Sequence, residues 1–221
     1  MKGFHSNSII LIFPLLLNFI FTACTKADTL TNKTIAVYGA SHSICSESDS
    51  AILFWQRELG FRVFRYGISG AGYSNNYSAT IPNEINNSPS HEIAILWSTT
   101  NGYPYPIENE DKFSPKSMKG GMRISIEKLK SKNPNVIILG FIMLPRFDDR
   151  NPEIRKPYME GQIEVFEEYN IPYLNQYYFF TADDTTIMYL PDKLHLTVKG
   201  YLHIRNQQLE FIRQNIQIGD E

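Results

Sequence analysis

The sequence predicts a three-layer α/β/α sandwich built around a central parallel sheet of about five strands. Two observations lead to this fold class. Short apolar runs rich in β-branched residues alternate along the chain with segments of helical periodicity. The apolar runs are also continuous rather than alternating, as in strands that are buried on both faces. In such folds ligands gather at the carboxyl ends of the strands, so functional residues are expected directly after each strand.

The predicted elements follow one another in a regular order. Strands are expected at 34–38, 61–66, 92–97, 135–141 and 171–174. Helices are expected at 49–59, 117–130, 152–169 and 198–216. The last helix is expected to bury one face, formed by Val198, Leu202, Leu209, Ile212 and Ile216. Segments 72–90 and 102–116 are expected to be long surface loops, and no internal repeat or second-domain boundary is visible.

The N-terminus has the pattern of a secretory signal peptide. Lys2 precedes an apolar run at 9–21 that is shorter than the roughly 20 residues a membrane-spanning helix needs. Small residues then lead into Cys24, which resembles a bacterial lipobox, where the mature chain begins at a lipid-bearing cysteine.

This pattern predicts a signal peptide at 1–23, an anchor and linker at 24–33, and one domain at 34–221. The protein is expected to be exported and held by a lipid anchor on a membrane, in the periplasm or at the cell surface. A plain signal peptide cut near Ala23, which would release a soluble periplasmic protein, is the alternative.

Composition narrows the function classes. Hydrophobic residues make up 43% and charged residues 20%, an ordinary globular balance. The net charge is −2 and no basic run stands out, so nothing suggests nucleic acid as a partner. With only two cysteines a Cys-rich zinc site is excluded. We expect Cys45 to be a small buried hydrophobe rather than a nucleophile, and His91 and His203 to lie on the surface.

Four short motifs lie where the predicted fold would place a ligand site. Three follow the first three strands and the fourth precedes the last helix: Gly39-Ala40-Ser41, Gly67-Ile68-Ser69-Gly70, Asn101-Gly102 and Asp192-Lys193-Leu194-His195. They resemble, in the same order, the four sequence blocks of the SGNH/GDSL hydrolase family. The resemblance extends over nearly the whole chain after the leader and is strongest to a branch of Bacteroidetes lipoproteins.

The resemblance implies a flavodoxin-like fold and a Ser–His–Asp catalytic triad. Ser41 would be the nucleophile, since a serine hydroxyl reacts well only when a base takes its proton. His195 would act as base and then as acid, a role that suits histidine because the unperturbed pKa of this residue type lies near neutrality. Asp192, three residues earlier, would accept the other ring N–H of His195. Each residue also has a simpler explanation: Ser41 as a helix N-cap, His195 as a structural histidine before a helix, and Asp192 as a turn former.

The resemblance also implies an oxyanion hole. Its donors would be the backbone N–H groups of Ser41 and Gly70 and the side-chain amide of Asn101, although Asn101 could be an ordinary turn residue. No metal or organic cofactor is required. Ser69 is a competing nucleophile, but it lacks the Gly-x-Ser-x-Gly pattern of a nucleophile elbow.

The expected substrate is an ester, either a small molecule or an O-acylated glycan. His42, Trp97 and Tyr103 are predicted to contact it at the pocket rim, where aromatic rings can stack on a sugar. The oligomeric state stays open.

Two positions depart from the family pattern. Ala40 replaces the aspartate of the GDSL motif, and Gly102 replaces an aspartate that often follows the asparagine of the third block. Both carboxylates normally brace loops. Because of these departures, an alternative stays open: a catalytically degenerate lipoprotein of this fold that binds a glycan or acyl ligand. A transferase that passes the acyl group to a sugar hydroxyl is a third hypothesis.

Overall fold

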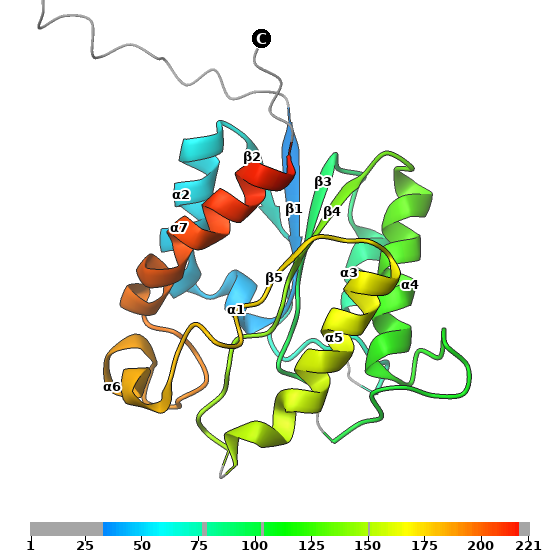
Figure 1. The fold of residues 1–221 in the computed structure, drawn as a ribbon. Coiled ribbons are helices and arrows are strands. Elements are labelled where there is room, and N and C mark those ends of the chain that lie inside the picture. The colour runs from blue at the N-terminus through cyan, green and yellow to red at the C-terminus, as the bar shows by residue number, and fades with distance from the viewer. Residues whose placement is uncertain (1–32, 77–78, 103, 150, 217–221) are drawn as a thin grey trace, which may run out of the picture.

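A five-stranded parallel sheet forms the centre of the molecule (Figure 1). The computed structural model describes residues 33–76, 79–102, 104–149 and 151–216. The strands are β1 (Thr34–Tyr38), β2 (Arg62–Arg65), β3 (Ile93–Trp97), β4 (Ile137–Phe141) and β5 (Tyr173–Leu174). Their order in the sheet is β2-β1-β3-β4-β5, and every neighbouring pair is parallel. The predicted fold class is confirmed, whereas the predicted signal peptide and Cys24 lie outside the described residues.

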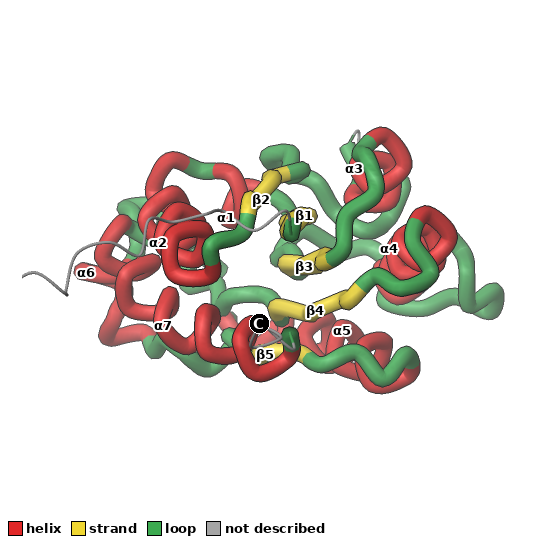
Figure 2. Tube along the Cα trace, turned by 90° about the horizontal axis from the view of Figure 1, so that it is seen from above, coloured by secondary structure: helices red, strands yellow, loops and turns green. Residues whose placement is uncertain are grey.

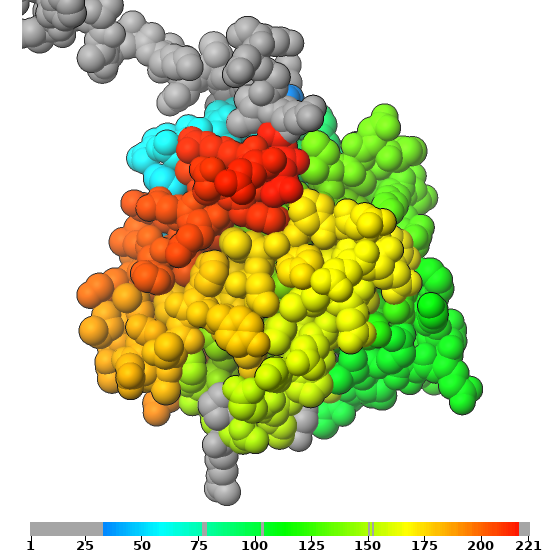
Figure 3. All heavy atoms as spheres, viewed as in Figure 1, coloured from blue at the N-terminus to red at the C-terminus, as the bar shows by residue number. Residues whose placement is uncertain are grey.

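Helices cover both faces of the sheet, as the view along the sheet in Figure 2 shows. One face carries α2 (Asp49–Leu59) and α7 (Val198–Asn215). The other carries α3 (Ile81–Asn87), α4 (Met118–Lys132) and α5 (Lys156–Glu168). Two short helices, α1 (Ser41–Ile44) and α6 (Thr185–Met188), lie in connections. The space-filling view of Figure 3 shows three neighbouring segments across the front of the molecule. They are α5, the segment around β5, and α7.

The central strands are apolar throughout because two helical layers bury them. All five residues of β3 are buried. In β1, Ile35 and Val37 pack into the core beneath α2 and α7, while Ala36 and Tyr38 pack into the core beneath α3 to α5. The edge strand β2 is largely exposed, in keeping with its single strand neighbour. The carboxyl ends of the strands therefore meet at one edge of the sheet, where β1 leads into α1 (Figure 1).

The expectation that 72–90 is a surface loop is wrong in part, because α3 lies within it. Thr80 caps this helix by accepting a hydrogen bond from the N–H of Asn83, and Pro82 stands in the first turn. Ile81 and Ile85 are fully buried against the sheet. A seven-residue helix spans too few turns to show a periodic apolar pattern in the sequence.

The predicted buried face of the last helix also needs correction. Leu209, Ile212 and Ile216 are buried as expected, but Val198 and Leu202 are 49% and 39% exposed. The buried stripe near the start of α7 is formed instead by Tyr201, Ile204 and Gln208. Both the predicted set of residues and the observed set have helical spacing. The observed set is buried because α7 packs on α2.

Candidate active site

Ser41 is presented by the turn that joins β1 to α1. It is the first residue of α1, three positions after the end of β1. The carbonyl oxygen of Ala40 accepts hydrogen bonds from both the backbone N–H and the side-chain hydroxyl of Ser43, at 3.0 and 2.8 Å. Ser43 is fully buried and Ala40 is 3% exposed. The hydroxyl of Ser43 therefore braces this turn, at which the family pattern would have placed an aspartate.

Ser41, His195 and Asp192 form one hydrogen-bonded chain. The Nε2 atom of His195 lies 2.8 Å from the hydroxyl oxygen of Ser41, although the two residues are 154 positions apart in the chain. The Nδ1 atom of His195 lies 2.7 Å from Oδ2 of Asp192. A carboxylate can only accept here, so Nδ1 carries the proton and Nε2 is left to accept the hydroxyl proton of Ser41.

The carboxyl group of Asp192 is held as an anion. Partial burial raises the pKa of Asp192, but hydrogen bonds from the ring of His195 and from the backbone N–H groups of His195 and Leu194 outweigh burial and lower it to about 2. The two backbone N–H groups donate to Oδ1 at 3.0 and 2.9 Å. Asp192 is therefore charged throughout the neutral range and keeps the ring in one tautomer.

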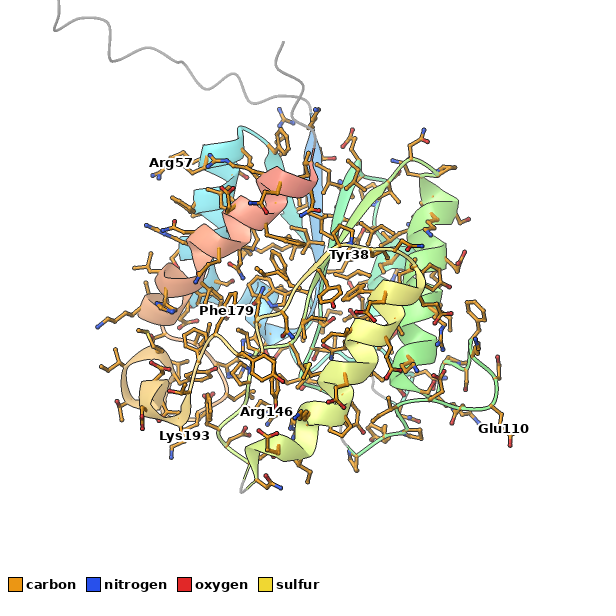
Figure 4. All side chains as sticks on the ribbon, in the orientation of Figure 1. Tyr38, Arg57, Glu110, Arg146, Phe179 and Lys193 are labelled. Carbon is orange, nitrogen blue, oxygen red and sulfur yellow. The ribbon has the colours of Figure 1, made fainter. Side chains whose placement is uncertain are left out.

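Backbone hydrogen bonds fix the turn from Asp192 to His195. Lys193 has a φ of 55°, in the left-handed region, and its N–H donates to the carbonyl of Leu190 at 2.9 Å. The N–H of Phe147, in the connection after β4, donates to the carbonyl of Lys193 at 3.0 Å. Figure 4 shows Lys193 and Arg146 at the same end of the molecule, where the strands finish.

Asn101 and Gly70 lie in adjoining turns after β3 and β2. The side-chain Nδ2 of Asn101 donates to the carbonyl of Ala71 at 2.9 Å. The hydroxyl of Thr99 donates to the same carbonyl at 3.2 Å and accepts the backbone N–H of Asn101 at 2.8 Å. These contacts join the second and third motifs and leave one N–H of the Asn101 amide without a partner in the described part of the chain.

Gly70 has a backbone conformation that favours glycine. Its φ is +78°, and a Cβ built there would meet no protein atom within 4 Å. The conformation, rather than crowding by the protein, therefore explains this glycine. Among the described residues, the backbone N–H groups of Gly70 and Ser41 donate to no other group, as an oxyanion hole requires.

Comparisons with known proteins bear on the fold. No protein-family model matches the sequence, and no curated protein matches it. A solved protein from Lactobacillus plantarum has a TM-score of 0.71 and 18% identity, covering 84% of this chain and 99% of that chain. A lipase/acylhydrolase from Enterococcus faecalis has a TM-score of 0.62 and 14% identity, covering 86% and 100%. A GDSL-like lipase from Bacteroides thetaiotaomicron has a TM-score of 0.57 and 15% identity, covering 80% and 88%.

The chain has the SGNH/GDSL hydrolase fold. The predicted resemblance is confirmed at this level. Within the SGNH/GDSL fold, the four motifs occupy the carboxyl edge of the sheet.

His42, a predicted substrate contact, lies buried beside His195. Its side chain is 4% exposed, and the two imidazole ring centres are 5.3 Å apart. Its Nε2 atom is buried without a hydrogen-bond partner. Burial, followed by electrostatic interactions with His195 and Arg146, lowers the pKa of His42 to about 3. A ring with this pKa is neutral at working pH and a weak base, so it is poorly suited to replace His195.

Trp97, predicted to lie at the pocket rim, is a core residue, and that expectation is wrong. Its side chain is 1% exposed. The indole packs edge-on against Phe141 and Tyr201 and in a tilted contact against Trp55. As the last residue of a central strand, Trp97 projects into one of the two covered faces. Tyr103, the third predicted contact, lies outside the described residues.

Other predicted side chains have mixed outcomes. His91 is buried at 8% exposed, with its ring nitrogens 3.1 and 3.0 Å from the hydroxyls of Thr34 and Tyr66, so the expectation of a surface residue is wrong. His203 is exposed, as expected. Cys45 is half-buried, and its sulfur lies 3.2 Å from the hydroxyl of Tyr201.

The described ranges hold neither a candidate metal cluster nor a membrane-spanning helix. There, no cluster of three or more His, Cys, Asp or Glu side chains could hold a metal ion. None of the described helices is long and apolar enough to cross a membrane.

Sequence reasoning missed the residues that brace the site. Ser43 and Thr99 hold the turns after β1 and β3, and Arg155 and Gln162 also bond to the turn after β3. Serine and threonine in a turn are common enough to carry no signal of their own. A buried arginine looks like a surface arginine in a single sequence, so Arg155 offered no signal either.

Proposed function

We propose that this protein is an ester hydrolase with Ser41 as its nucleophile. The hydrogen-bonded chain from Ser41 through His195 to Asp192, with distances of 2.8 and 2.7 Å, is the observation that carries the proposal. It supplies a nucleophile, a base within reach of its proton, and an anion that orients the base.

The reaction would proceed by acyl transfer in two steps. Ser41 attacks the ester carbonyl carbon as His195 removes its proton, and the negative charge develops on the carbonyl oxygen. The N–H groups of Ser41 and Gly70 and the free amide N–H of Asn101 would stabilise that oxygen. His195 then protonates the departing alcohol, and the ring next activates a water that releases the acid and restores Ser41.

The proposed substrate is a small ester, such as an O-acetyl or other O-acyl group on a carbohydrate, met outside the cytoplasm. The signal-peptide pattern ending at Cys24 supports an exported, lipid-anchored protein. Neighbours described as a lipase/acylhydrolase and a GDSL-like lipase support ester chemistry in general. The carbohydrate part rests on the expected location and on the family resemblance.

The second candidate is a lipoprotein that binds a glycan or acyl ligand without turnover. The absence of the two aspartates, at Ala40 and Gly102, is the observation that favours it. Saturable binding of an acetylated glycan, together with no turnover across a panel of esters, would support this candidate over the hydrolase.

The proposed hydrolase is tested with p-nitrophenyl acetate and the purified protein. Ser41→Ala should reduce hydrolysis to the background of the free ester. Ser69→Ala is the matched control, because Ser69 is exposed in the neighbouring turn and has no place in the hydrogen-bonded chain. A fluorophosphonate probe should label the wild type and Ser69→Ala but leave Ser41→Ala unlabelled. Equal hydrolysis by wild type and Ser41→Ala, without labelling, would refute the proposal.

A further inference from the structure

The turn that carries Asn101 accepts hydrogen bonds from two further side chains, besides its contacts with Ala71. Nη1 of Arg155 donates to the carbonyl of Thr100 at 2.8 Å, and Nε2 of Gln162 donates to the carbonyl of Thr99 at 3.2 Å. Thr99 and Thr100 are 4% and 5% exposed, so these carbonyls depend on protein donors rather than on water. Both side chains come from the segment formed by a 3₁₀ turn (Pro152–Arg155) and α5.

Arg155 and Gln162 are themselves fixed by the connection after β4. The guanidinium of Arg155 pairs with both carboxylate oxygens of Asp149, at 2.5 and 3.3 Å, and its side chain is only 9% exposed. Such a two-point contact fixes the plane of the guanidinium as well as its position. The Oε1 atom of Gln162 accepts the backbone N–H of Met143 at 3.1 Å. Each side chain thus links the turn after β3 to the connection after β4.

Gly102, at the position where the family pattern often has an aspartate, packs closely against Tyr158. A Cβ at this position would lie 3.1 and 3.2 Å from two ring carbons of Tyr158 on α5. The hydroxyl of Tyr158 donates to the carbonyl of Tyr105, which holds the ring in place. A side chain at 102 would therefore require this ring to give way by a few tenths of an ångström. The turn is held instead by Arg155 and Gln162, which bond to the carbonyls of Thr100 and Thr99.

We propose that Arg155 is a positioning residue for the oxyanion-hole amide of Asn101. This inference rests on the proposed hydrolase function. By holding the carbonyl of Thr100, Arg155 fixes the peptide that leads directly into Asn101. The amide of Asn101 then stays bonded to Ala71, and its second N–H remains available to the developing oxyanion. Loss of Arg155 leaves a buried carbonyl without its donor and lets the turn shift.

The experiment compares three variants of the purified full chain with the wild type: Arg155→Met, Arg155→Lys and Arg123→Met. Arg123 on α4 is the matched control because it is also buried, at 3% exposed, and pairs with the carboxylates of Glu108, before α4, and Glu168, at the end of α5. The end point of fluorophosphonate labelling counts the competent Ser41 sites, so kcat is expressed per folded active site. Circular dichroism checks that each variant is folded.

Arg155→Met is expected to lower kcat about 10- to 100-fold, since a misplacement of about 1 Å can cost roughly 100-fold. KM should change less than about twofold, because the lost interaction is made in the transition state. Arg155→Lys keeps a charge opposite Asp149 and should lose less than Arg155→Met. Arg123→Met should lower thermal stability but change kcat per site by less than about twofold. If both Arg155 variants matched Arg123→Met in kcat, the inference would be overturned.

A double-mutant cycle tests whether Arg155 acts through Asn101. The rate constant of Ser41 labelling is measured for Asn101→Ala, Arg155→Met and the double variant, because a single-turnover rate stays measurable when catalysis is slow. In the Asn101→Ala background, Arg155→Met should slow labelling less than about twofold. An equal slowing in both backgrounds would overturn the positioning role while leaving Ser41 as nucleophile. Absence of labelling at Ser41 in the wild type would overturn both the inference and the proposed function.

Discussion

Replacing Asp192 with asparagine should inactivate the proposed enzyme by reversing the tautomer of His195. In the structure Oδ1 accepts two backbone N–H groups, and Oδ2 accepts the ring N–H of His195. Backbone N–H groups cannot become acceptors, so the single oxygen of asparagine must face them. The amide NH₂ then faces Nδ1, which has to accept, and the ring proton moves to Nε2. The hydroxyl of Ser41 loses its base.

The expected loss in kcat for Asp192→Asn is roughly 10³- to 10⁴-fold near neutral pH. That loss corresponds to about 4 to 5.5 kcal/mol of activation free energy. It would be measured with p-nitrophenyl acetate, with the active sites counted by fluorophosphonate labelling. Asp192→Ala provides a second comparison. Because alanine leaves the ring free to adopt either tautomer, this variant should retain at least as much activity as Asp192→Asn.

Asp184→Asn is the matched control for this substitution. Asp184 also accepts a backbone N–H and a side-chain hydrogen bond, both from Thr181, but it takes no part in the hydrogen-bonded chain. Its substitution should change kcat less than about twofold, as for an exposed site away from the chemistry. If Asp192→Asn kept more than about a tenth of wild-type kcat, the assigned role of the carboxylate in orienting the base would be refuted.

Three further predictions concern buried residues around the site. Trp97→Ala should lower the free energy of unfolding by about 3 to 5 kcal/mol in urea denaturation, because it removes a core side chain; a loss below about 1 kcal/mol would contradict its core placement. The ring protons of His42 should not titrate between pH 5 and 8 in NMR spectra, because its pKa in the folded protein is about 3. The unfolded chain binds a proton at His42 below its ordinary pKa of 6.5, so stability should fall as the pH drops from 6.5 toward 3, and less so in His42→Gln. Gly102→Ala should destabilise the protein by about 1 to 3 kcal/mol through overpacking on Tyr158, seen as a lower Tm; an unchanged Tm would show that the ring yields freely.

Most of the fold could be predicted from the sequence because the strands of a parallel sheet carry a simple pattern. Burial on both faces makes each central strand a continuous apolar run, so β1, β3 and β4 were visible within two residues at each end. The grouping of Ser41, Gly70 and Asn101 followed from the same rule, since parallel strands finish at one edge of the sheet. The prediction holds however far apart the three residues lie in the sequence, because it depends only on where the strands end.

The depth of individual side chains could not be predicted, because it depends on which helices cover each face. Trp97 is the last residue of β3, and His91 lies just before this strand. At either end of a strand a side chain can line a cleft or fill the core. Trp97 fills the core because α2 and α7 close over that face of β3. Thr34 and Tyr66, far away in the sequence, enclose His91. These partners are brought together only by the pairing of strands.

Hydrogen bonds from other side chains hold the turns at the two positions that depart from the family pattern. The case for a degenerate binding protein began with the missing carboxylates at Ala40 and Gly102. At the first position the buried hydroxyl of Ser43 bonds to the carbonyl of Ala40, and next to the second Arg155 and Gln162 bond to the carbonyls of Thr100 and Thr99. The turns of both Ser41 and Asn101 are therefore held without the two carboxylates, so the missing aspartates are weak evidence against catalysis. If the brace from Arg155 serves catalysis, the double-mutant cycle of Arg155 and Asn101 will show coupling between the two residues.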